Sequence, residues 1–389
     1  MQRHLDLKIN EHFKKYKQIL ILLGSRQVGK TTIIKKLLPE CAYFLVDNEP
    51  IRKILETYDI EAYKTLLSKK TGVVVIDEIH LLSDPGRAAK IIYDQLSDIN
   101  LIITGSSSFH IKNKTGESLA GRKIDYNIFP LTFSEYLNQK GVEVDLNFNI
   151  LEKVINSKQY FVADKLYPFD LKNILENVLL YGLYPQLIDN PNDEKYLLNF
   201  VDSLIFKDIL ELNLIEDKRL ARNLLRLLAF QIGNMINYAE LARSLQADQR
   251  TIKRYIEIFE QSFIIFRLYP YSKKKRDEII KAEKIFFYDT GIRNALIGDF
   301  SSLDARADKG ALFENFIISE LVKQNSYTEK NYRFYYWRTK QDSEIDIVLE
   351  KGQELIGVEI KYHRGAINQA FKNRYPEARV MTVTGGNFY

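Results

Sequence analysis

The first third of the chain alternates short apolar runs, rich in β-branched residues, with amphipathic stretches. The apolar runs predict strands at 18–23, 42–46, 73–77, 101–104 and 124–129. Stretches between them, such as 31–38 and 87–97, have the apolar spacing of helices. Strands that alternate with helices predict a parallel sheet covered by helices on both faces.

The remainder of the chain follows other patterns. The hydrophobic period is helical from 149 to 213, without a convincing strand. Residues 216–285 combine short helices with a final β-like run at 263–269, and the last hundred residues place a helix before several strands. At 389 residues the chain is too long for one compact core, so we expect two to four domains.

The composition is that of an ordinary soluble globular protein, with 46% apolar and 28% charged residues. The single cysteine, Cys41, cannot form an internal disulfide, so nothing requires an oxidising compartment. The charged N-terminus lacks the apolar core of a signal peptide. No apolar run approaches the roughly 20 residues that cross a bilayer. We therefore expect a cytoplasmic protein without a membrane partner.

The net charge of +5 is concentrated in one segment. Residues 243–284 contain eleven Lys and Arg against six Asp and Glu, which equals the excess of the whole chain. A local basic patch favours an acidic partner such as nucleic acid. A set of solvated lysines is the alternative.

The sequence GSRQVGKT fits the phosphate-binding P-loop pattern G-x-x-x-x-G-K-[ST] at every fixed position. It follows a predicted strand and precedes a predicted helix, which is the context that the motif needs. Lys30 is expected to reach the β- and γ-phosphates of ATP, and the Thr31 hydroxyl to bind Mg²⁺. The candidate nucleotide-binding residues are Gly24, Ser25, Arg26, Gln27, Val28, Gly29, Lys30, Thr31 and Thr32.

A second part of this site is predicted at the end of the strand VVVID. Asp77 and Glu78 stand at its carboxyl end, where open α/β sheets place ligands. Asp77 is expected to hold the Mg²⁺ shell, and Glu78 to orient or deprotonate the attacking water.

Further catalytic candidates follow along the chain. The next strand ends in Ser106 and Ser107, which can sense the γ-phosphate and whose position resembles the polar sensor of AAA+ ATPases. Arg122 and Arg87 are candidates for an arginine finger, although Arg87 reads better as a surface residue. Because such a finger often comes from a neighbouring subunit, a homo-oligomer is plausible.

The basic segment has the geometry of a helix-turn-helix. A helix at 237–245 and a second at 249–259 are separated by about three residues, and a β-like run follows as a wing. Arg250, Lys253 and Arg254 lie off the apolar face of the second helix and could meet phosphates of DNA or RNA. A protein-binding winged helix is the alternative.

The last hundred residues carry a spaced set of charged residues. Glu314 lies on a predicted helix, and Asp346, Glu359 and Lys361 lie on the two strands of a predicted hairpin, in the pattern D-x12-E-x-K. This constellation is seen in metal-dependent nucleases: Glu314, Asp346 and Glu359 would bind Mg²⁺, and Lys361 would position water. Cross-strand salt bridges of Lys361 are the alternative.

The chain resembles prokaryotic AAA-type ATPases that end in a domain of unknown function. The segments that carry the resemblance are GSRQVGKTT, VVVIDEIH, ITGSSSF, ESLAGRK, FPLTFSEYL, YGLYPQLI, QRTIKRYIEIFEQSFIIFRLYPY, FFYDTGIRNALIG, GALFENFIISELV and EIDIVLEKGQELIGVEIKY. The resemblance implies that Lys30, Thr31, Asp77 and Glu78 keep their nucleotide roles, and it supports Arg122 over Arg87. It also implies a terminal domain similar to the PD-(D/E)XK restriction-endonuclease fold.

We therefore predict an α/β multidomain protein. Its expected domains are a P-loop, parallel-sheet AAA-type core (1–140), a helical lid (141–215), a winged helix (216–285) and a restriction-endonuclease-like α/β domain (286–389). The leading hypothesis is a Mg²⁺-dependent ATPase whose nucleotide state moves the winged helix and the nuclease-like domain on DNA. The alternative is a nucleotide-gated signalling or scaffold switch that binds protein and cuts no nucleic acid.

Overall fold

The structure is a computed structural model of the 389-residue chain. It describes residues 2–67, 72–105, 119–147, 149–157, 169–211, 215–272, 282–339, 343–363 and 369–389, with the side chains of 204–211 left aside. The chain forms two compact units. The N-terminal unit contains residues 2–129 and 261–263, and the C-terminal unit contains 130–260 and 264–389.

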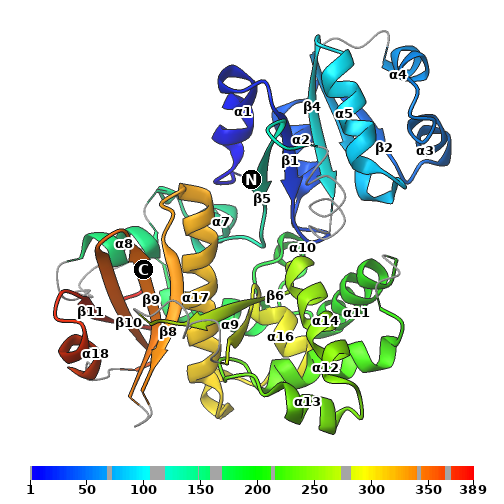
Figure 1. Ribbon diagram of the computed structural model, residues 1–389. Helices are drawn as coiled ribbons and strands as arrows, with labels where there is room; N and C mark the ends of the chain where they lie inside the picture. The colour runs from blue at the N-terminus through cyan, green and yellow to red at the C-terminus, as the bar shows by residue number, and fades with distance from the viewer. Residues whose placement is uncertain are drawn as a thin grey trace. The chain divides into compact units, whose positions relative to one another are not determined.

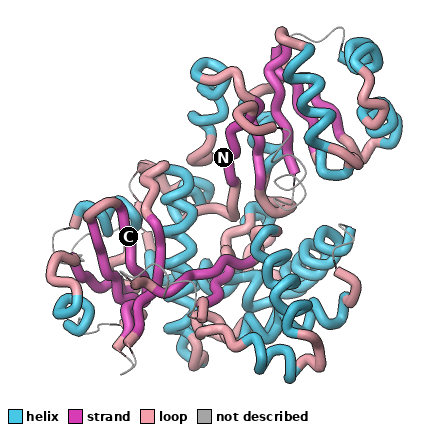
Figure 2. Tube along the Cα trace, in the orientation of Figure 1, coloured by secondary structure: helices cyan, strands magenta, loops and turns pink. Residues whose placement is uncertain are grey.

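The N-terminal unit is built on a five-stranded parallel sheet with the strand order β2-β3-β4-β1-β5 (Figures 1 and 2). Its elements are α1 (Asp6–Lys15), β1 (Ile19–Leu23), α2 (Lys30–Leu37), β2 (Ala42–Leu45), α3 (Glu49–Leu55), α4 (Ile60–Leu67), β3 (Gly72–Asp77), η1 (Ile79–Leu81), α5 (Pro85–Gln95), β4 (Ile99–Gly105) and β5 (Lys123–Asn127). The five predicted strands and the two predicted helices of this region are confirmed within a few residues.

Strand β1 lies between β4 and β5, and all five of its side chains are fully buried. A strand that is buried on both faces has no polar alternation, which is why ILILL is continuously apolar. Because all five strands are parallel, their carboxyl ends lie at one edge of the sheet. The loops after β1, β3 and β4 therefore start side by side.

The C-terminal unit combines helices with a six-stranded mixed sheet in the order β11-β10-β9-β8-β6-β7 (Figure 1). Its elements are α7 (Phe133–Gln139), α8 (Ile150–Asn156), α9 (Leu171–Tyr181), α10 (Pro185–Asp189), α11 (Glu194–Glu211), α12 (Lys218–Phe230), α13 (Tyr238–Ser244), α14 (Gln249–Gln261), β6 (Ile265–Pro270), β7 (Lys284–Phe287), α16 (Thr290–Ile297), η2 (Leu303–Ala305), α17 (Lys309–Thr328), β8 (Arg333–Arg338), β9 (Glu344–Lys351), β10 (Glu354–Lys361), α18 (Gln369–Arg374) and β11 (Arg379–Thr384).

The predicted wing is part of this sheet. Strands β6 and β7 pair as an antiparallel hairpin, and β6 also pairs in parallel with β8. The domain boundary predicted at 285 therefore falls inside β7. The local sequence indicates a β-like run here. The hydrophobic pattern does not show, however, that β6 pairs with a strand more than sixty residues away.

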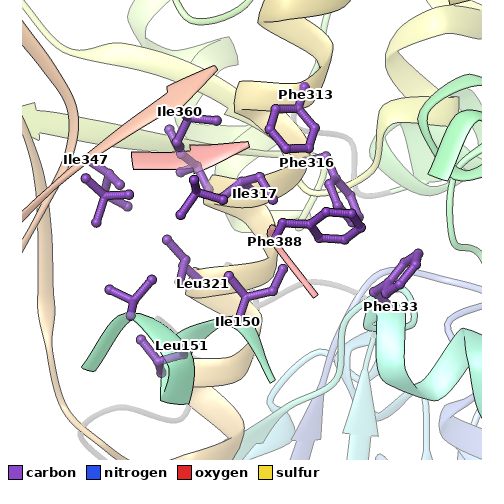
Figure 3. Packing of buried hydrophobic residues seen from close by; sticks show 14 of the residues in the cluster. Phe133, Ile150, Leu151, Phe313, Phe316, Ile317, Leu321, Ile347, Ile360 and Phe388 are labelled. Carbon is purple, nitrogen blue, oxygen red and sulfur yellow. The ribbon is translucent and has the colours of Figure 1, made fainter. Parts of the chain in front are cut away.

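Helix α17 is the centre of the C-terminal core (Figure 3). Phe313, Phe316, Ile317 and Leu321 pack together with side chains of β9, β10, α8 and the C-terminal residue pair 388–389. Phe133 of α7 joins the same core, with its ring 5.9 Å from that of Phe316. The N-terminal unit consequently ends at residue 129, before α7, whereas the sequence placed this boundary at 140.

None of the helices in the described part of the chain combines the length and apolarity that crossing a lipid bilayer requires.

Candidate functional site

The loop between β1 and α2 has the backbone of a phosphate-binding turn. Gln27 and Gly29 have positive φ angles of 64° and 99°. Gly24 has a different reason to be glycine: a Cβ atom there would lie 2.1 Å from the carbonyl oxygen of Ile128. The first glycine of the motif is thus required by close packing against the chain after β5, and Gly29 by its left-handed backbone.

Lys30 is buried at the first position of α2. Its Nζ donates to the carbonyl oxygens of Gly24 at 2.8 Å and Ser25 at 3.0 Å. The two carbonyls hold the ammonium group over the loop, where the loop N–H groups and the α2 N-terminus also attract anions. Ser25 and Val28 are buried, Arg26 is partly exposed, and Thr32 is exposed.

Asp77 lies at the end of β3 and is surrounded by hydroxyl groups. Thr31 donates from its Oγ1 to Asp77 Oδ2 at 3.3 Å. Tyr43 on β2 donates to the same Oδ2 and lies 3.3 Å from Thr31 Oγ1, and Thr104 on β4 donates to Oδ1. Burial and the bond to Asp77 raise the pKa of Tyr43, so its hydroxyl stays protonated. The two predicted Mg²⁺ ligands are therefore side by side.

Glu78 is held in a left-handed backbone conformation with a φ of 56°. Its N–H donates to Thr104 Oγ1 at 3.4 Å, and its Oε2 lies 3.1 Å from His80 Nδ1 without the alignment of a hydrogen bond. Burial raises the pKa of Glu78, but the contact with His80 and the charge of Lys30 outweigh burial and lower it to about 2. Glu78 is consequently ionised at neutral pH.

The remaining catalytic candidates are two serines and two arginines. Ser106 and Ser107 lie outside the described residues. Arg122 forms a bidentate ion pair with Asp94 of α5, with Nε at 2.9 Å and Nη2 at 3.3 Å. Arg87 lies over the ring of Tyr58. Arg122 would have to leave Asp94 to act on a nucleotide, so its finger role stays a prediction.

Three residues of this site were missed by sequence reasoning. Tyr43 and Thr104 reach Asp77 only because β2 and β4 flank β3, which is a property of the strand order. Thr104 lies within the motif ITGSSSF. Its place at the end of a predicted strand could have indicated that it lies near Asp77. Arg3 donates to Val28 O at 2.9 Å and to Phe129 O at 2.8 Å, and its sequence separation from both gave no signal.

A second charged cluster lies in the C-terminal unit. Lys284 of β7 is buried; its Nζ pairs with Glu344 and lies 3.7 Å from Glu314 Oε1. Asp346 Oδ2 accepts from the Ile360 N–H at 2.6 Å and lies 3.6 Å from Lys361 Nζ. The cluster contains the predicted Glu314, Asp346 and Lys361, together with Lys284, which the sequence did not single out.

A strand irregularity decides where Asp346 stands. Tyr335 pairs with Val348 and Trp337 with Ile345, so two residues of β9, Asp346 and Ile347, face one residue of β8. This bulge interrupts the two-residue alternation of side chains along β9. Bulges commonly redirect side chains in this way.

The carboxylates of the cluster are buried close to one another, which changes their pKa values. Burial and the neighbouring Asp346 raise the pKa of Glu314 to about 8, and burial also raises that of Asp346. Glu314 Oε1 accepts no hydrogen bond, which leaves one oxygen for a cation. Lys284 already stands beside that oxygen, however. Within the described residues no group of three or more His, Cys, Asp or Glu side chains could hold a metal ion.

Two of the predicted metal ligands, Glu314 and Asp346, lie in this cluster. Glu359 is buried on β10, and its membership of a metal-binding set with Glu314 and Asp346 remains a prediction. The predicted salt bridge of Lys361 to Asp346 is present. Lys284 and Lys361 supply positive charge to the cluster, and Arg338 Nη1 lies 3.7 Å from Glu344 Oε2.

The two helices predicted for the helix-turn-helix are present as α13 and α14, and the three basic candidates are exposed on α14. Arg254 pairs with Glu216 at 3.1 Å, Lys253 lies over the ring of Tyr238, and Arg250 is exposed near the start of the helix. Helix α12 adds four more exposed basic residues, which are Lys218, Arg219, Arg222 and Arg226.

Three family models match the chain in succession. Residues 16–137 match an AAA domain, residues 172–303 match a domain of unknown function (DUF8612), and residues 309–384 match another domain of unknown function (DUF4143). Residues 16–137, which include the P-loop, are therefore similar to an AAA domain. The second match crosses the boundaries predicted at 215 and 285.

Whole-chain relatives are uncharacterised proteins. One from Mycobacterium tuberculosis is 25% identical over 88% of this chain and 70% of its own length. One from Methanocaldococcus jannaschii is 26% identical over 95% of this chain and 81% of its own length. Among solved structures, a Walker-type ATPase of Pyrococcus abyssi covers 75% of this chain and 94% of its own, with 15% identity and a TM-score of 0.46.

Proposed function

From the AAA domain over residues 16–137 and its assembled P-loop, we propose that this chain binds ATP and hydrolyses it with Mg²⁺. The observation that carries the proposal is the meeting of three groups from two distant segments. Buried Lys30 holds its ammonium over the loop, and Thr31 Oγ1 stands 3.3 Å from Asp77 Oδ2.

The donor set fits a magnesium ion. A hydroxyl and a carboxylate are the hard oxygen ligands that Mg²⁺ prefers beside substrate phosphates. Mg²⁺ neutralises phosphate charge when it is bound. Thr31 and Asp77 would hold it, Lys30 would meet the phosphate oxygens, and the loop N–H groups would surround them.

Glu78 acts on the attacking water. Its pKa is lowered by the contact with His80 and the charge of Lys30, so the carboxylate is ionised and can accept a hydrogen bond. Glu78 therefore orients the water or takes its proton. The left-handed backbone fixed by Thr104 and the contact with His80 hold the carboxylate in place.

The test is ATP hydrolysis in Mg²⁺ by the wild type, Lys30→Ala and Glu78→Gln, with Lys36→Ala as the matched control on the exposed face of α2. We expect loss of at least about a hundredfold in both site variants and little change in the control. Glu78→Gln should still bind ATP. Hydrolysis that survives in Lys30→Ala would contradict the proposal, and ATP binding without any hydrolysis by the wild type would leave a nucleotide sensor.

We further propose that nucleotide state is coupled to DNA through the basic helices α12 and α14. The exposed Arg250, Lys253 and Arg254 support this, and α12 presents its own basic residues to solvent. Phosphate contacts release counterions, so DNA binding should weaken steeply with added salt. Replacing the three α14 residues with Ala should reduce the slope of log K against log salt and any stimulation of ATP hydrolysis by duplex DNA.

The second candidate is a nucleotide-gated switch that binds protein. It is favoured by the hairpin β6–β7, which is built into the C-terminal sheet through β8 and so differs from a free wing. Hydrolysis that is indifferent to DNA at low and high salt would support this candidate over the DNA-coupled ATPase.

The C-terminal unit supports a nuclease-like fold through its element order, helix α17, strands β8–β10, helix α18 and strand β11. Lys284 stands against a metal-dependent cut, because it occupies the side of Glu314 that a cation would use. We therefore propose a binding domain that does not cleave. Incubation of supercoiled DNA with Mg²⁺ or Mn²⁺ should give no nicking, whereas nicking that disappears in Asp346→Ala would overturn this assignment.

A further inference from the structure

Tyr43 reaches into the candidate magnesium site from an edge strand. Its hydroxyl donates to Asp77 Oδ2 and lies 3.3 Å from Thr31 Oγ1. These are the two oxygen atoms that the proposed function assigns to the metal. A single hydroxyl group thus contacts both candidate ligands at once.

The Tyr43 hydroxyl covers one side of the pair of candidate ligand oxygens. Mg²⁺ binds its ligands at about 2.0–2.1 Å in an octahedron, so neighbouring ligand oxygens are about 3 Å apart. Thr31 Oγ1 and Asp77 Oδ2 are 3.3 Å apart, close to that spacing. A metal ion that approached both oxygens from the side of Tyr43 would meet the hydroxyl that now lies against them.

The position of Tyr43 allows it to leave. Strand β2 is at the edge of the five-stranded sheet, and the Tyr43 side chain is only partly buried. Thr104, by contrast, is fully buried on central strand β4 and holds Asp77 by its other oxygen, Oδ1. Asp77 can therefore exchange the Tyr43 hydroxyl for a metal ion while Thr104 keeps its carboxylate oriented.

We propose that the Tyr43 hydroxyl is an internal competitor of Mg²⁺, which occupies the metal position in the nucleotide-free site and must swing out before Mg²⁺-nucleotide is bound. The inference rests on the proposed nucleotide site. In this proposal Tyr43 sets the Mg²⁺ concentration that the site needs in order to bind Mg²⁺-ATP. Nothing in the P-loop or in the Asp77–Glu78 pair predicts such a threshold.

The test is the Mg²⁺ dependence of nucleotide binding, measured with a fluorescent N-methylanthraniloyl ATP analogue titrated with MgCl₂ from an EDTA baseline. Tyr43→Phe keeps the ring and removes the competing hydroxyl. Losing one hydrogen bond to a charged group should lower the half-saturating Mg²⁺ concentration about tenfold to a hundredfold. Binding of the analogue in EDTA should be unchanged.

The matched control is Tyr63→Phe in the same unit, whose hydroxyl donates to the Leu55 carbonyl. It should leave the Mg²⁺ requirement at the wild-type value. An unchanged or higher requirement in Tyr43→Phe, with normal binding by the wild type, would overturn the competitor role and leave the proposed function intact. Failure of the wild type to bind the analogue at any Mg²⁺ concentration would overturn both.

Discussion

Ion pairs of Asp308 connect the start of α17 to α16. Asp308 precedes α17 and pairs with Arg293 at 2.5 Å and with Arg306 at 2.8 Å, and both arginines are nearly inaccessible to solvent. Burial raises the pKa of Asp308, but the hydrogen bonds and charges of Arg306 and Arg293 outweigh it and lower the pKa to about 2. Arg293 also donates to Ala229 O, so this one carboxylate holds the arginine that joins α16 to α12.

The first prediction concerns the pH dependence of this pair. Since the folded-state pKa lies below the ordinary value of 3.8, the stabilisation is complete above about pH 4 and is lost as the pH falls toward 2. Asp308→Asn should lower the free energy of unfolding by about 2 kcal/mol at pH 7 and by about half of that at pH 3. Urea unfolding at both pH values measures this, with exposed Asp304→Asn as the control. A loss that does not change with pH would contradict the ion-pair explanation.

The second prediction concerns Lys284. Removing one partner of a buried ion pair leaves carboxylates without a counter-charge and costs about 3–5 kcal/mol. Lys284→Met should therefore destabilise the protein strongly, whereas exposed Lys351→Met should have little effect. Thermal unfolding in EDTA and in Mn²⁺ extends the test: if Lys284 stands in for a cation, Mn²⁺ should restore part of the stability of Lys284→Met and none of the wild type. An equal change in the unfolding temperature of the wild type and of Lys284→Met on addition of Mn²⁺ would contradict that role.

At the scale of elements, polar side chains of α17 complete the ends of other elements. Glu320 accepts from the Phe133 N–H at the start of α7, and Gln324 accepts from the Leu151 N–H at the start of α8. Asn315 exchanges two hydrogen bonds with Phe287 on edge strand β7. Helix N-termini and strand edges leave unpaired backbone groups, and buried ones must be satisfied. These contacts explain why α7 and α8 belong to the C-terminal unit.

The third prediction concerns the junction of β1 with the P-loop. Gly24→Ala would place its Cβ 2.1 Å from the carbonyl oxygen of Ile128, a backbone atom that cannot move without parting the sheet. We expect a loss of about 3 kcal/mol or more in the stability of the N-terminal unit, even without nucleotide. Thermal unfolding measures it, with Gly310→Ala, where a Cβ meets nothing, as the control. A stable variant that had lost only ATP binding would show that Gly24 serves the phosphates alone.

At the scale of the whole molecule, the chain passes between the two units more than once. It crosses at 129–130 and again on both sides of the short segment 261–263, which packs in the N-terminal unit. Phe129 and Phe263 are in contact there, with ring centroids 5.8 Å apart. Arg3 binds the carbonyl of Phe129 and that of Val28 in the P-loop. A single side chain therefore joins the nucleotide loop to the residue at which the chain leaves the unit.

The fourth prediction follows from the division into two units. A ligand that binds one folded unit stabilises that unit by about 2.7 kcal/mol at a hundred times its Kd. Calorimetry should resolve two unfolding transitions, and Mg²⁺ with ADP should raise the midpoint of only one. Lys30→Ala should abolish that shift without moving the other transition. One transition that moves as a whole would show that the units unfold together.

The sequence by itself determined the main features of the N-terminal unit. Strand runs such as 18–23, the P-loop and the position of Asp77 and Glu78 follow from local patterns, because a buried parallel strand must be apolar and phosphate chemistry needs fixed local spacing. The α17 helix and the β9–β10 hairpin were likewise predictable from their periods.

Only the tertiary structure decided which distant groups meet. The strand order brings Tyr43 and Thr104 to Asp77, the hairpin β6–β7 brings Lys284 to Glu314, and Asp346 lies in a bulge of β9. Each of these contacts joins segments separated by tens of residues, or depends on one extra residue in a strand. Hydrophobic periodicity depends on residues that are neighbours along the chain. It therefore does not predict which remote strands pair, or which charged residues that pairing buries.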